Sequence, residues 1–419
     1  MKFLYNVGIS LAEKILPASR LLSDKMKLFV DGRKEVFSTL EKKTKPNDKF
    51  LWFHAASLGE YEQSVPVIEA LKQDFSDYKI LVTFFSPSGY ENKKNSKLAD
   101  VITYLPLDTK ANAEKFVEIV NPKMVFFIKY EVWPNYLAAL ENKKIPTVLF
   151  SANFRKDQVY FKNYGGLMRK SLQKFDHIFV QEKSSADLLQ NIGIKNVSVS
   201  GDTRFDRVNA QLEANNKIDF ISEFKNGQLC IVVGSSWPED EDLLVDYIND
   251  TSEAIKWIIA PHIFKNVKNL ANRINKKTLL FSEMKNQDLK SANVFIVDTI
   301  GYLTRIYSYA DIAYVGGAAG KTGLHNILEP AAFGIPIVIG ENHQKFPEAE
   351  KLKNHGGLFV VSNGKELKDL LDKLISDTDF RNETGEKSAE FVQQNMGATK
   401  MIRDYAKLRL KSSIPFKLK

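Results

Sequence analysis

The chain has 419 residues, of which 44% are hydrophobic and 26% are charged, and its formal net charge is +8. This composition is typical of a globular protein and excludes the disordered and fibrous classes, while the length predicts two domains. The single cysteine, Cys230, excludes an internal disulfide framework. Because Cys230 stands in an apolar run, we expect a buried thiol rather than a nucleophile.

The positive charge is concentrated at the two ends of the chain. Residues 1–45 contain ten Lys or Arg and five Asp or Glu, and residues 400–419 contain seven Lys or Arg and one Asp. Basic ends bind nucleic acid or anionic lipid, or they are simply solvated. The charge by itself leaves these three possibilities open.

The apolar residues near the N-terminus favour anionic lipid over nucleic acid as the partner. Leu11, Ile15, Leu22, Met26 and Phe29 recur among Lys and Arg residues, which predicts an amphipathic helix lying on lipid headgroups. The apolar run is too short and too interrupted to span a membrane, and it is a poor secretory signal. The alternative is an amphipathic helix packed on its own domain.

From residue 50 onward, short β-rich segments alternate with helical ones, a pattern that pauses near residue 210 and then restarts. Such alternation predicts an α/β protein with two doubly wound, Rossmann-like parallel sheets and a ligand cleft between them. The predicted segments are 1–45, 46–208, a linker over 209–227, 228–395 and a basic helix or tail over 396–419. The predicted strands are 50–56, 79–85, 123–129, 145–151, 176–181, 229–234, 257–260, 294–298, 312–315 and 335–339.

Several ligand-binding motifs are missing from this sequence. No G-x-G-x-x-G follows the first strand, the glycine run at 316–320 lacks the P-loop spacing, and no G-x-S-x-G elbow occurs. The six histidines and one cysteine show no zinc-ligand spacing. We therefore expect neither a metal nor a bound cofactor.

Three charged residues stand out in the first half, two of them directly after predicted strands and the third, Arg204, in the segment 201–206 that closes this half. Glu60 stands at a helix start, where a carboxylate accepts a proton from a substrate or complements the helix macrodipole. Glu131 precedes Pro134, which fits a first helical turn, although a surface pair with Lys129 is the alternative. Arg204 offers a planar guanidinium group that can donate paired hydrogen bonds to a carboxylate or phosphate.

The second half contains a glycine-rich turn. Gly316 and Gly317 follow the strand 312–315, and the chain then leads into a helix near Asn326. A turn of this kind feeding a helix N-terminus is typical of an anion site, because unpaired N–H groups point outward. Asn326 and Glu329 are spaced as a capping box, which is a purely structural interpretation. Both interpretations hold together if Asn326 caps the helix while Glu329 turns outward to ribose hydroxyls.

These motifs resemble those of the bacterial 3-deoxy-D-manno-octulosonate (Kdo) transferases of lipid A biosynthesis. The H-x-x-S-x-G-E of residues 54–60 and the E-x-W-P-N of 131–135 are specific, whereas the glycine turn with its following glutamate occurs in many glycosyltransferases. Residues 201–206 and 298–301 are also part of the resemblance. The motifs occur in the same order as in the family, over nearly the whole chain.

The resemblance implies a GT-B glycosyltransferase with CMP-Kdo as donor and a lipid A precursor, lipid IVA, as acceptor at the cytoplasmic face of the inner membrane. It assigns acceptor binding to 46–208 and nucleotide-sugar binding to 228–395. Transfer would be an inverting single displacement with Glu60 as general base, supported by Glu131 and Arg204. The implied nucleotide contacts are Pro261, Ile300, Gly301, Tyr302, Asn326, Ile327, Leu328 and Glu329.

This chain departs from the family pattern at two of these positions. Many members read Pro-Arg-His where this chain has Pro261 followed by His262, which makes His262 a candidate contact in place of the arginine. Members often have lysine where this chain has Arg204.

A GT-B enzyme using a UDP- or GDP-sugar and a non-catalytic membrane adaptor are the alternative functions. The resemblance carries no prediction of oligomeric state.

Overall fold

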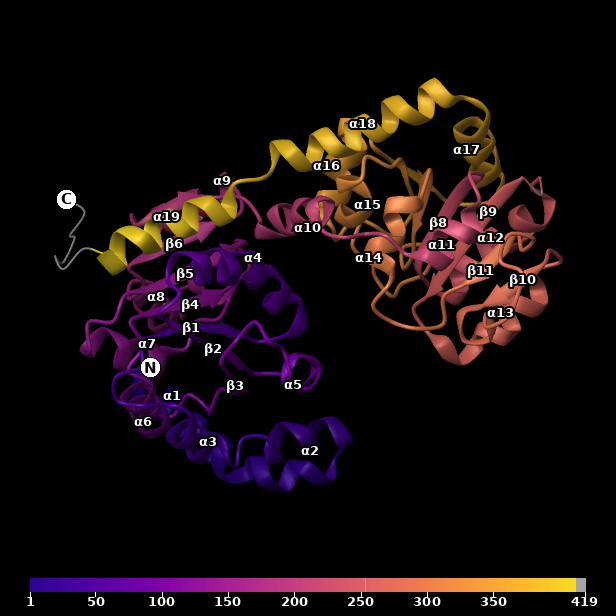
Figure 1. The fold of residues 1–419 in the computed structure, drawn as a ribbon. Helices are drawn as coiled ribbons and strands as arrows, with labels where there is room; N and C mark the ends of the chain where they lie inside the picture. Colours follow the sequence, from indigo (N-terminus) through magenta and orange to yellow (C-terminus); the bar gives the residue numbers. More distant parts are fainter. Residues whose placement is uncertain (253, 412–419) are drawn as a thin grey trace. The chain divides into compact units, whose positions relative to one another are not determined.

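The computed structural model describes residues 1–252 and 254–411 (Figure 1). The chain forms two compact units: unit 1 comprises residues 1–207 and 396–419, and unit 2 comprises residues 208–395. The last eight residues of the predicted basic tail, 412–419, lie outside the described part. The chain therefore begins in unit 1 and returns to it after completing unit 2.

Unit 1 is built around a seven-stranded parallel sheet with the order β3-β2-β1-β4-β5-β6-β7. Its central strands are runs of buried residues, as expected where helices cover both faces of a parallel sheet (Figure 1). The strands are β1 (Phe50–Ala55), β2 (Lys79–Phe84), β3 (Val101–Tyr104), β4 (Met124–Ile128), β5 (Thr147–Ala152), β6 (His177–Val180) and β7 (Val197–Val199).

The strand order of unit 1 reverses between β1 and β4, which pair directly in parallel. At such a reversal the chain leaves two neighbouring strands toward opposite faces of the sheet, so a crevice opens at their carboxyl ends. The helices are α1 (Lys2–Ile15), α2 (Asp24–Asp31), α3 (Val36–Lys43), α4 (Leu58–Asp74), α5 (Pro87–Lys93), α6 (Lys110–Val120), α7 (Pro134–Asn142), α8 (Gly166–Leu172), α9 (Lys183–Asn191) and α19 (Ala398–Lys411).

The C-terminal helix α19 is part of unit 1. Ile402 and Ala406 are fully buried in the same apolar cluster as strand residues of β1 and β2. Arg403 forms an ion pair with Asp74 at the end of α4. Helix α10 (Thr203–Glu213) begins in unit 1 and ends in unit 2.

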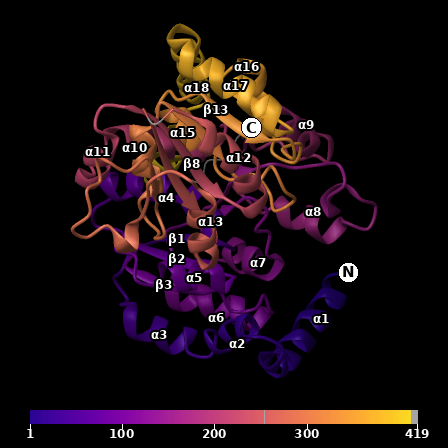
Figure 2. The ribbon, with the colours of Figure 1, turned by 90° about the vertical axis from the view of Figure 1, so that its right-hand side faces the viewer.

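Unit 2 contains a second seven-stranded parallel sheet, with the order β10-β11-β9-β8-β12-β13-β14. Figure 2 labels two of its strands, β8 and β13. Its strands are β8 (Leu229–Ser236), β9 (Ile255–Pro261), β10 (Thr278–Leu280), β11 (Val294–Ile296), β12 (Ile312–Val315), β13 (Ile337–Gly340) and β14 (Leu358–Val361). Its helices are α11 (Asp219–Lys225), α12 (Pro238–Asp250), α13 (Val267–Arg273), α14 (Leu303–Ile306), α15 (Leu328–Ala332), α16 (Pro347–His355), α17 (Gly364–Ser376) and α18 (Thr378–Gln394). The strand order of this sheet reverses between β8 and β12.

The predicted α/β class with two parallel sheets is confirmed, and Cys230 is fully buried in β8. The segment 209–227, predicted as a linker, contains the end of α10 and all of α11. The N-terminal segment forms α1, a 3-10 helix (Leu16–Leu21), α2 and α3. None of the described helices is both long enough and apolar enough to cross a membrane.

Candidate active site

Glu60 and Glu131 come from the two strands at which the sheet of unit 1 reverses. Glu60 lies in the first turn of α4, directly after β1, and Glu131 lies in the loop between β4 and α7. Because β1 and β4 are neighbours, the two carboxylates belong to one crevice. The two glutamates are 71 residues apart in the sequence, and the parallel pairing of β1 with β4 brings them together.

Glu60 is held against the backbone at the start of its own helix. Its Oε2 atom accepts a hydrogen bond of 2.5 Å from the N–H of Ala56, and the N–H of Ser57 also donates to the carboxylate. Both bonds satisfy backbone donors at the start of α4, where a carboxylate also complements the helix macrodipole. A Cβ built on the adjacent Gly59 meets nothing within 4 Å, so open space lies beside this turn.

The environment of Glu60 raises the pKa of its carboxyl group to about 7. Burial is the largest cause, and the negative charge of Glu131 is the second. The two backbone hydrogen bonds and Lys129 lower this pKa, but they do not offset the loss of solvation. A carboxyl group with a pKa near neutrality exchanges a proton readily at physiological pH, as a general base must.

Glu131 is fixed by two ring nitrogens. Its Oε2 atom accepts a hydrogen bond of 2.8 Å from Nε1 of Trp133 and lies 3.1 Å from Nε2 of the buried His54. On the other side of that ring, Nδ1 lies 2.9 Å from the hydroxyl of Thr83. The same nitrogen lies 3.2 Å from the carbonyl oxygen of Thr83, so Thr83 fixes the orientation of the ring. Among the described residues Glu131 forms no ion pair with Lys129, so the surface-pair alternative is wrong.

Arg204 lies in the first turn of α10, and its guanidinium is oriented by a neighbouring carboxylate. Its Nε and Nη2 atoms lie 2.9 and 2.8 Å from Oδ2 of Asp202, and its backbone N–H donates to Oδ1 of the same residue. Gln181 donates to this carboxylate as well. Asp202 therefore fixes the direction of the guanidinium, a role that the sequence pattern did not indicate.

In unit 2, three rings form a stack beside the strands at which that sheet reverses. Trp237 follows β8 and lies 4.6 Å from the ring of His262, which follows β9, and the His262 ring lies 4.7 Å from that of His325. Nε1 of Trp237 donates to Nε2 of His325 at 2.9 Å. Since an indole is a donor only, Nε2 of His325 carries no proton. Burial, and in second place the nearby His262, lowers the pKa of His325 to about 4, so this ring is neutral at physiological pH.

The expectation that Gly316 and Gly317 offer unpaired N–H groups to an anion is wrong. The N–H of Gly316 donates to the carbonyl of Gly234 in β8, and the N–H of Gly317 donates to Asp240 at 2.7 Å. The carboxylate of Asp240, which is buried in the first turn of α12, also accepts from Ala319 and Tyr314. A strand carbonyl and an internal carboxylate therefore accept the two N–H groups that the sequence pattern offered to a ligand.

The prediction for Asn326 also requires correction, because the cap of α15 is Ile327 and not Asn326. The side chain of Asn326 instead accepts from the N–H of Leu328 at 3.1 Å and donates to Glu329 at 3.0 Å. Glu329 further accepts from the hydroxyl of Thr304. Glu329 thereby joins the start of α15 to the start of α14.

The remaining predicted nucleotide contacts surround these groups. Pro261 is the last residue of β9. Ile300 is highly exposed, Gly301 has the left-handed φ of +94°, and the ring of Tyr302 packs against Phe220 and Phe281. The Thr304–Glu329 bond therefore connects the segment that carries Ile300, Gly301 and Tyr302 with the segment of Asn326, Ile327, Leu328 and Glu329.

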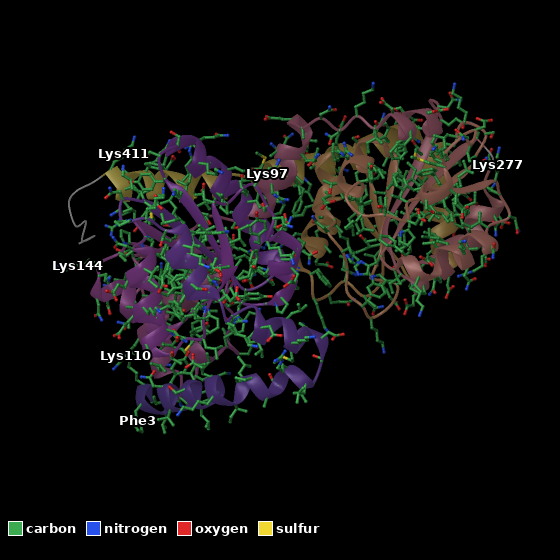
Figure 3. The ribbon with its side chains drawn as sticks, turned by 60° about the horizontal axis from the view of Figure 1, so that its bottom comes forward. Phe3, Lys97, Lys110, Lys144, Lys277 and Lys411 are labelled. Atoms are coloured by element: carbon green, nitrogen blue, oxygen red, sulfur yellow. The ribbon has the colours of Figure 1, made fainter. Side chains whose placement is uncertain are left out.

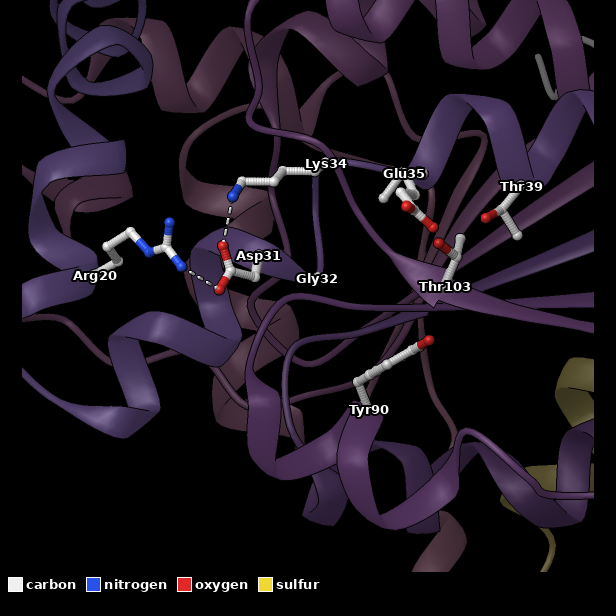
Figure 4. Close-up of a pocket in the computed structure, with 9 residues that line it drawn as sticks. Arg20, Asp31, Gly32, Lys34, Glu35, Thr39, Tyr90 and Thr103 are labelled. Carbon is white, nitrogen blue, oxygen red and sulfur yellow. Dashed lines mark hydrogen bonds and ion pairs between the residues drawn. The ribbon is translucent and has the colours of Figure 1, made fainter.

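A separate pocket of about 410 Å³ lies in the basic N-terminal segment of unit 1 (Figure 4). Arg20 and Lys34 line it, and both form ion pairs with Asp31, at 3.1 and 2.7 Å. Tyr90 and Thr103 form part of the opposite wall. Asp31 and Glu35, which also lines the pocket, together balance the charge of the two cations, so this pocket is polar rather than strongly basic.

The residues 31–207 match the family model described as 3-deoxy-D-manno-octulosonic-acid transferase (kdotransferase). The chain is 30% identical over 335 residues to the 3-deoxy-D-manno-octulosonic acid transferase of Aquifex aeolicus, an alignment that covers 78% of this chain and 86% of that protein. The chain belongs to the Kdo transferase family. Its identity to the transferase of the same name from Haemophilus influenzae is 27% over 388 residues, covering 88% of this chain and 89% of that one.

Solved structures support the fold expected of a Kdo transferase. The UDP-GlcNAc 2-epimerase from Neisseria meningitidis superposes with a TM-score of 0.61 at 17% identity, covering 86% of this chain and all of that one. The MnaA protein of S. aureus superposes with a TM-score of 0.57 at 16% identity, covering 88% of this chain and 100% of that one. At these identities the likeness concerns the fold alone, and it confirms the predicted GT-B class.

Several residues of the two sites were not assigned a role by sequence reasoning. His54 and Trp133 stand inside the quoted motifs, but nothing in their spacing indicates that both contact Glu131. Asp240 accepts the N–H of Trp237, the N-cap residue of α12, but tryptophan is not a residue type that marks an N-cap in a sequence. Its bond to Gly317, 77 residues further along the chain, depends on the pairing of β8 with β12 and has no local signal.

The glycine turn of unit 2 supplies a stability prediction. Gly317 has a φ of +96°, and a Cβ there would lie 2.1 Å from the carbonyl oxygen of Gly323. Gly227 has a φ of +74°, and a Cβ there would meet nothing within 4 Å. An alanine at this position therefore measures the cost of backbone strain alone. We expect Gly227→Ala to destabilise unit 2 by about 1–2 kcal/mol and Gly317→Ala by at least about 1 kcal/mol more. Urea unfolding of the two variants measures the difference, and equal losses would contradict a steric role for Gly317.

Proposed function

We propose that this protein transfers a Kdo residue from CMP-Kdo to a lipid A precursor, with Glu60 as the general base. The observation that carries the proposal is the half-buried carboxyl group of Glu60, whose pKa is raised to about 7 at the strand reversal of unit 1. Membership of the Kdo transferase family supports the donor and the acceptor class.

The reaction is a single displacement in which Glu60 removes the proton from an acceptor hydroxyl. The hydroxyl oxygen forms a bond to the anomeric carbon of Kdo, and CMP leaves with the electron pair of the broken bond, so the configuration inverts. CMP is a good leaving group because its phosphate carries the departing charge, and no covalent enzyme intermediate is required. A positioned base contributes about 10²–10⁴ in rate to such a step.

Glu131 supports the same step through its charge. Its hydrogen bonds to Trp133 and His54 hold the carboxylate in place, and its repulsion contributes to the raised pKa of Glu60. A base with a higher pKa takes the acceptor proton more readily as long as it is ionised. We assign to Arg204, oriented by Asp202, the stabilisation of negative charge as the donor reacts.

The donor nucleotide is assigned to unit 2 in this proposal. The candidates are the loop residues after β9 and β11 and the segment at the start of α15, of which Thr304 and Glu329 are already joined by a hydrogen bond. The neutral His325 and the exposed His262 offer ring nitrogens where many relatives have an arginine. The proposed contacts are Pro261, His262, Ile300, Gly301, Tyr302, Asn326, Ile327, Leu328 and Glu329. Among the described residues, no group of three or more His, Cys, Asp or Glu side chains is arranged to hold a metal ion.

We further propose that the N-terminal segment associates with the surface of the inner membrane, on the cytoplasmic side, where the acceptor lies. Helix α1 has no buried residue, and Phe3 and Leu4 are 76% and 70% exposed. Figure 3 shows Phe3 at the outer edge of unit 1. Leu21, the last residue of the 3-10 helix, and Leu22 after it are also highly exposed. Lys2, Lys14 and Arg20 stand among these apolar residues. Apolar area and positive charge together are what an interfacial helix requires.

The role of Glu60 is tested by Glu60→Gln, which keeps the shape of the side chain but cannot accept the proton. We expect transfer from CMP-Kdo to lipid IVA to fall by at least about 10²-fold, with thermal stability nearly unchanged. Glu69→Gln changes an exposed glutamate of the same helix and is the matched control. A Glu60→Gln enzyme with nearly native turnover would show that another group is the base.

The membrane proposal is tested by the double substitution Phe3→Ser and Leu4→Ser. Since each CH₂ group withdrawn from water contributes about 0.8 kcal/mol, we expect binding to anionic vesicles to weaken by at least about tenfold. Leu408→Ser replaces an equally exposed residue of the basic helix α19 and is the control. Sedimentation with vesicles measures both, and loss of binding in Leu408→Ser alone would move the membrane contact to the C-terminal helix.

A further inference from the structure

Helix α1 is held to unit 1 by polar side chains. The hydroxyl of Tyr5 donates to Oδ2 of Asp108 at 2.7 Å, and the side chain of Asn6 accepts from Nδ2 of Asn135 at 2.9 Å. Near the other end of the helix, Glu13 accepts a hydrogen bond from Asn112. Since no residue of α1 is buried, these bonds hold the helix on unit 1 while its apolar residues stay exposed.

Asp108 is fully buried and connects α1 to the start of α7. Its Oδ2 atom accepts from the N–H of Asn135 at 3.0 Å, and its Oδ1 atom accepts from the N–H of Tyr136 at 2.9 Å. Its backbone carbonyl accepts from the side chain of Asn135 as well. The two N–H groups belong to the first turn of α7, where they have no partner within the helix. Asp108 therefore caps α7 from a distant part of the sequence.

The capped turn directly follows the residues that hold Glu131. Trp133 is the N-cap residue of α7, and its indole donates to Oε2 of Glu131. The ring of Trp133 also packs against Phe85 at 4.9 Å and against His54 at 6.0 Å. The path from α1 to the carboxylate of Glu131 thus consists of Tyr5, Asp108 and the first turn of α7, all within unit 1.

The hydroxyl of Tyr5 matters because a buried carboxylate needs every available donor. Burial outweighs the opposing effect of the bonds to Asn135, Tyr5 and Tyr136, so the pKa of Asp108 is raised to about 6. Without the Tyr5 hydroxyl, Oδ2 keeps one donor and the ionised form becomes less favourable. A protonated Asp108 is a weaker acceptor for the two N–H groups of α7.

We propose that Asp108, with Tyr5 of α1 as its outer partner, is a positioning residue that holds the loop carrying Glu131. The inference rests on the proposed function of Glu60 and Glu131 and adds a role for α1 beyond contact with the membrane. The apolar residues of α1 and its Tyr5 contact are separate features, so membrane binding and positioning are separable by substitution.

The test compares Tyr5→Phe with Glu13→Gln in the full-length protein. Tyr5→Phe removes one hydroxyl and leaves the apolar residues of α1 unchanged, whereas Glu13→Gln loosens the other end of the same helix. We expect Tyr5→Phe to lower kcat about threefold to tenfold, with the KM for the acceptor and vesicle binding unchanged. The acid limb of kcat/KM should move to lower pH, because a displaced Glu131 repels the carboxylate of Glu60 less. Amide hydrogen exchange should become faster in residues 131–136.

The outcomes separate the inference from the function on which it rests. Native exchange rates in residues 131–136 of Tyr5→Phe would overturn the positioning role, as would a lower kcat without a shift of the acid limb. An equal effect of Glu13→Gln would also overturn it, because general loosening of α1 would then explain the loss. If the wild-type protein transfers no Kdo, the proposed function fails, whereas hydrogen exchange still tests the contact. Asp108→Asn should reproduce the exchange result by removing the charge itself.

Discussion

The placement of two carboxylates at one end of a buried sheet is the constraint on which the proposed chemistry depends. Glu60 follows strand β1 and Glu131 follows the adjacent strand β4, and the strand order of the sheet reverses between these two strands. The surroundings of the two carboxylates differ. Glu131 receives bonds from Trp133 and His54, whereas the pKa of Glu60 rises chiefly through burial. Two carboxylates in different environments therefore take different roles.

The sheet of unit 2 reverses its strand order in the same way, but the carboxylate beside this reversal has a different role. The reversal lies between β8 and β12, and the chain beyond these strands carries Trp237 and the glycine turn. There the buried carboxylate of Asp240 satisfies backbone N–H groups instead of standing ready for a proton. Asp240 stabilises the turn, which leaves the neutral His325 and the Thr304–Glu329 pair as the polar groups nearest to a nucleotide in our proposal.

The central strands of both sheets were predictable from sequence, because they are long apolar runs covered on both faces. The strands that escaped prediction are β3, β7, β10 and β14, and these are the four edges of the two sheets. An edge strand has one neighbour and is short, so it requires a weaker apolar pattern. Likewise, Glu60 and Glu131 were found through local motifs, while Asp108 was missed because its partner Tyr5 lies 103 residues away.

The central claim is that Glu60 acts as a base whose pKa is set by burial and by Glu131. The most direct measurement is the pH dependence of kcat/KM for Kdo transfer by the native enzyme and by Glu131→Gln. Because the base must be ionised, activity should fall as the pH drops through about 7 in the native enzyme. Removing the charge of Glu131 lowers the pKa of Glu60, so the acid limb should move to lower pH. An acid limb at the same pH in both enzymes would contradict the account.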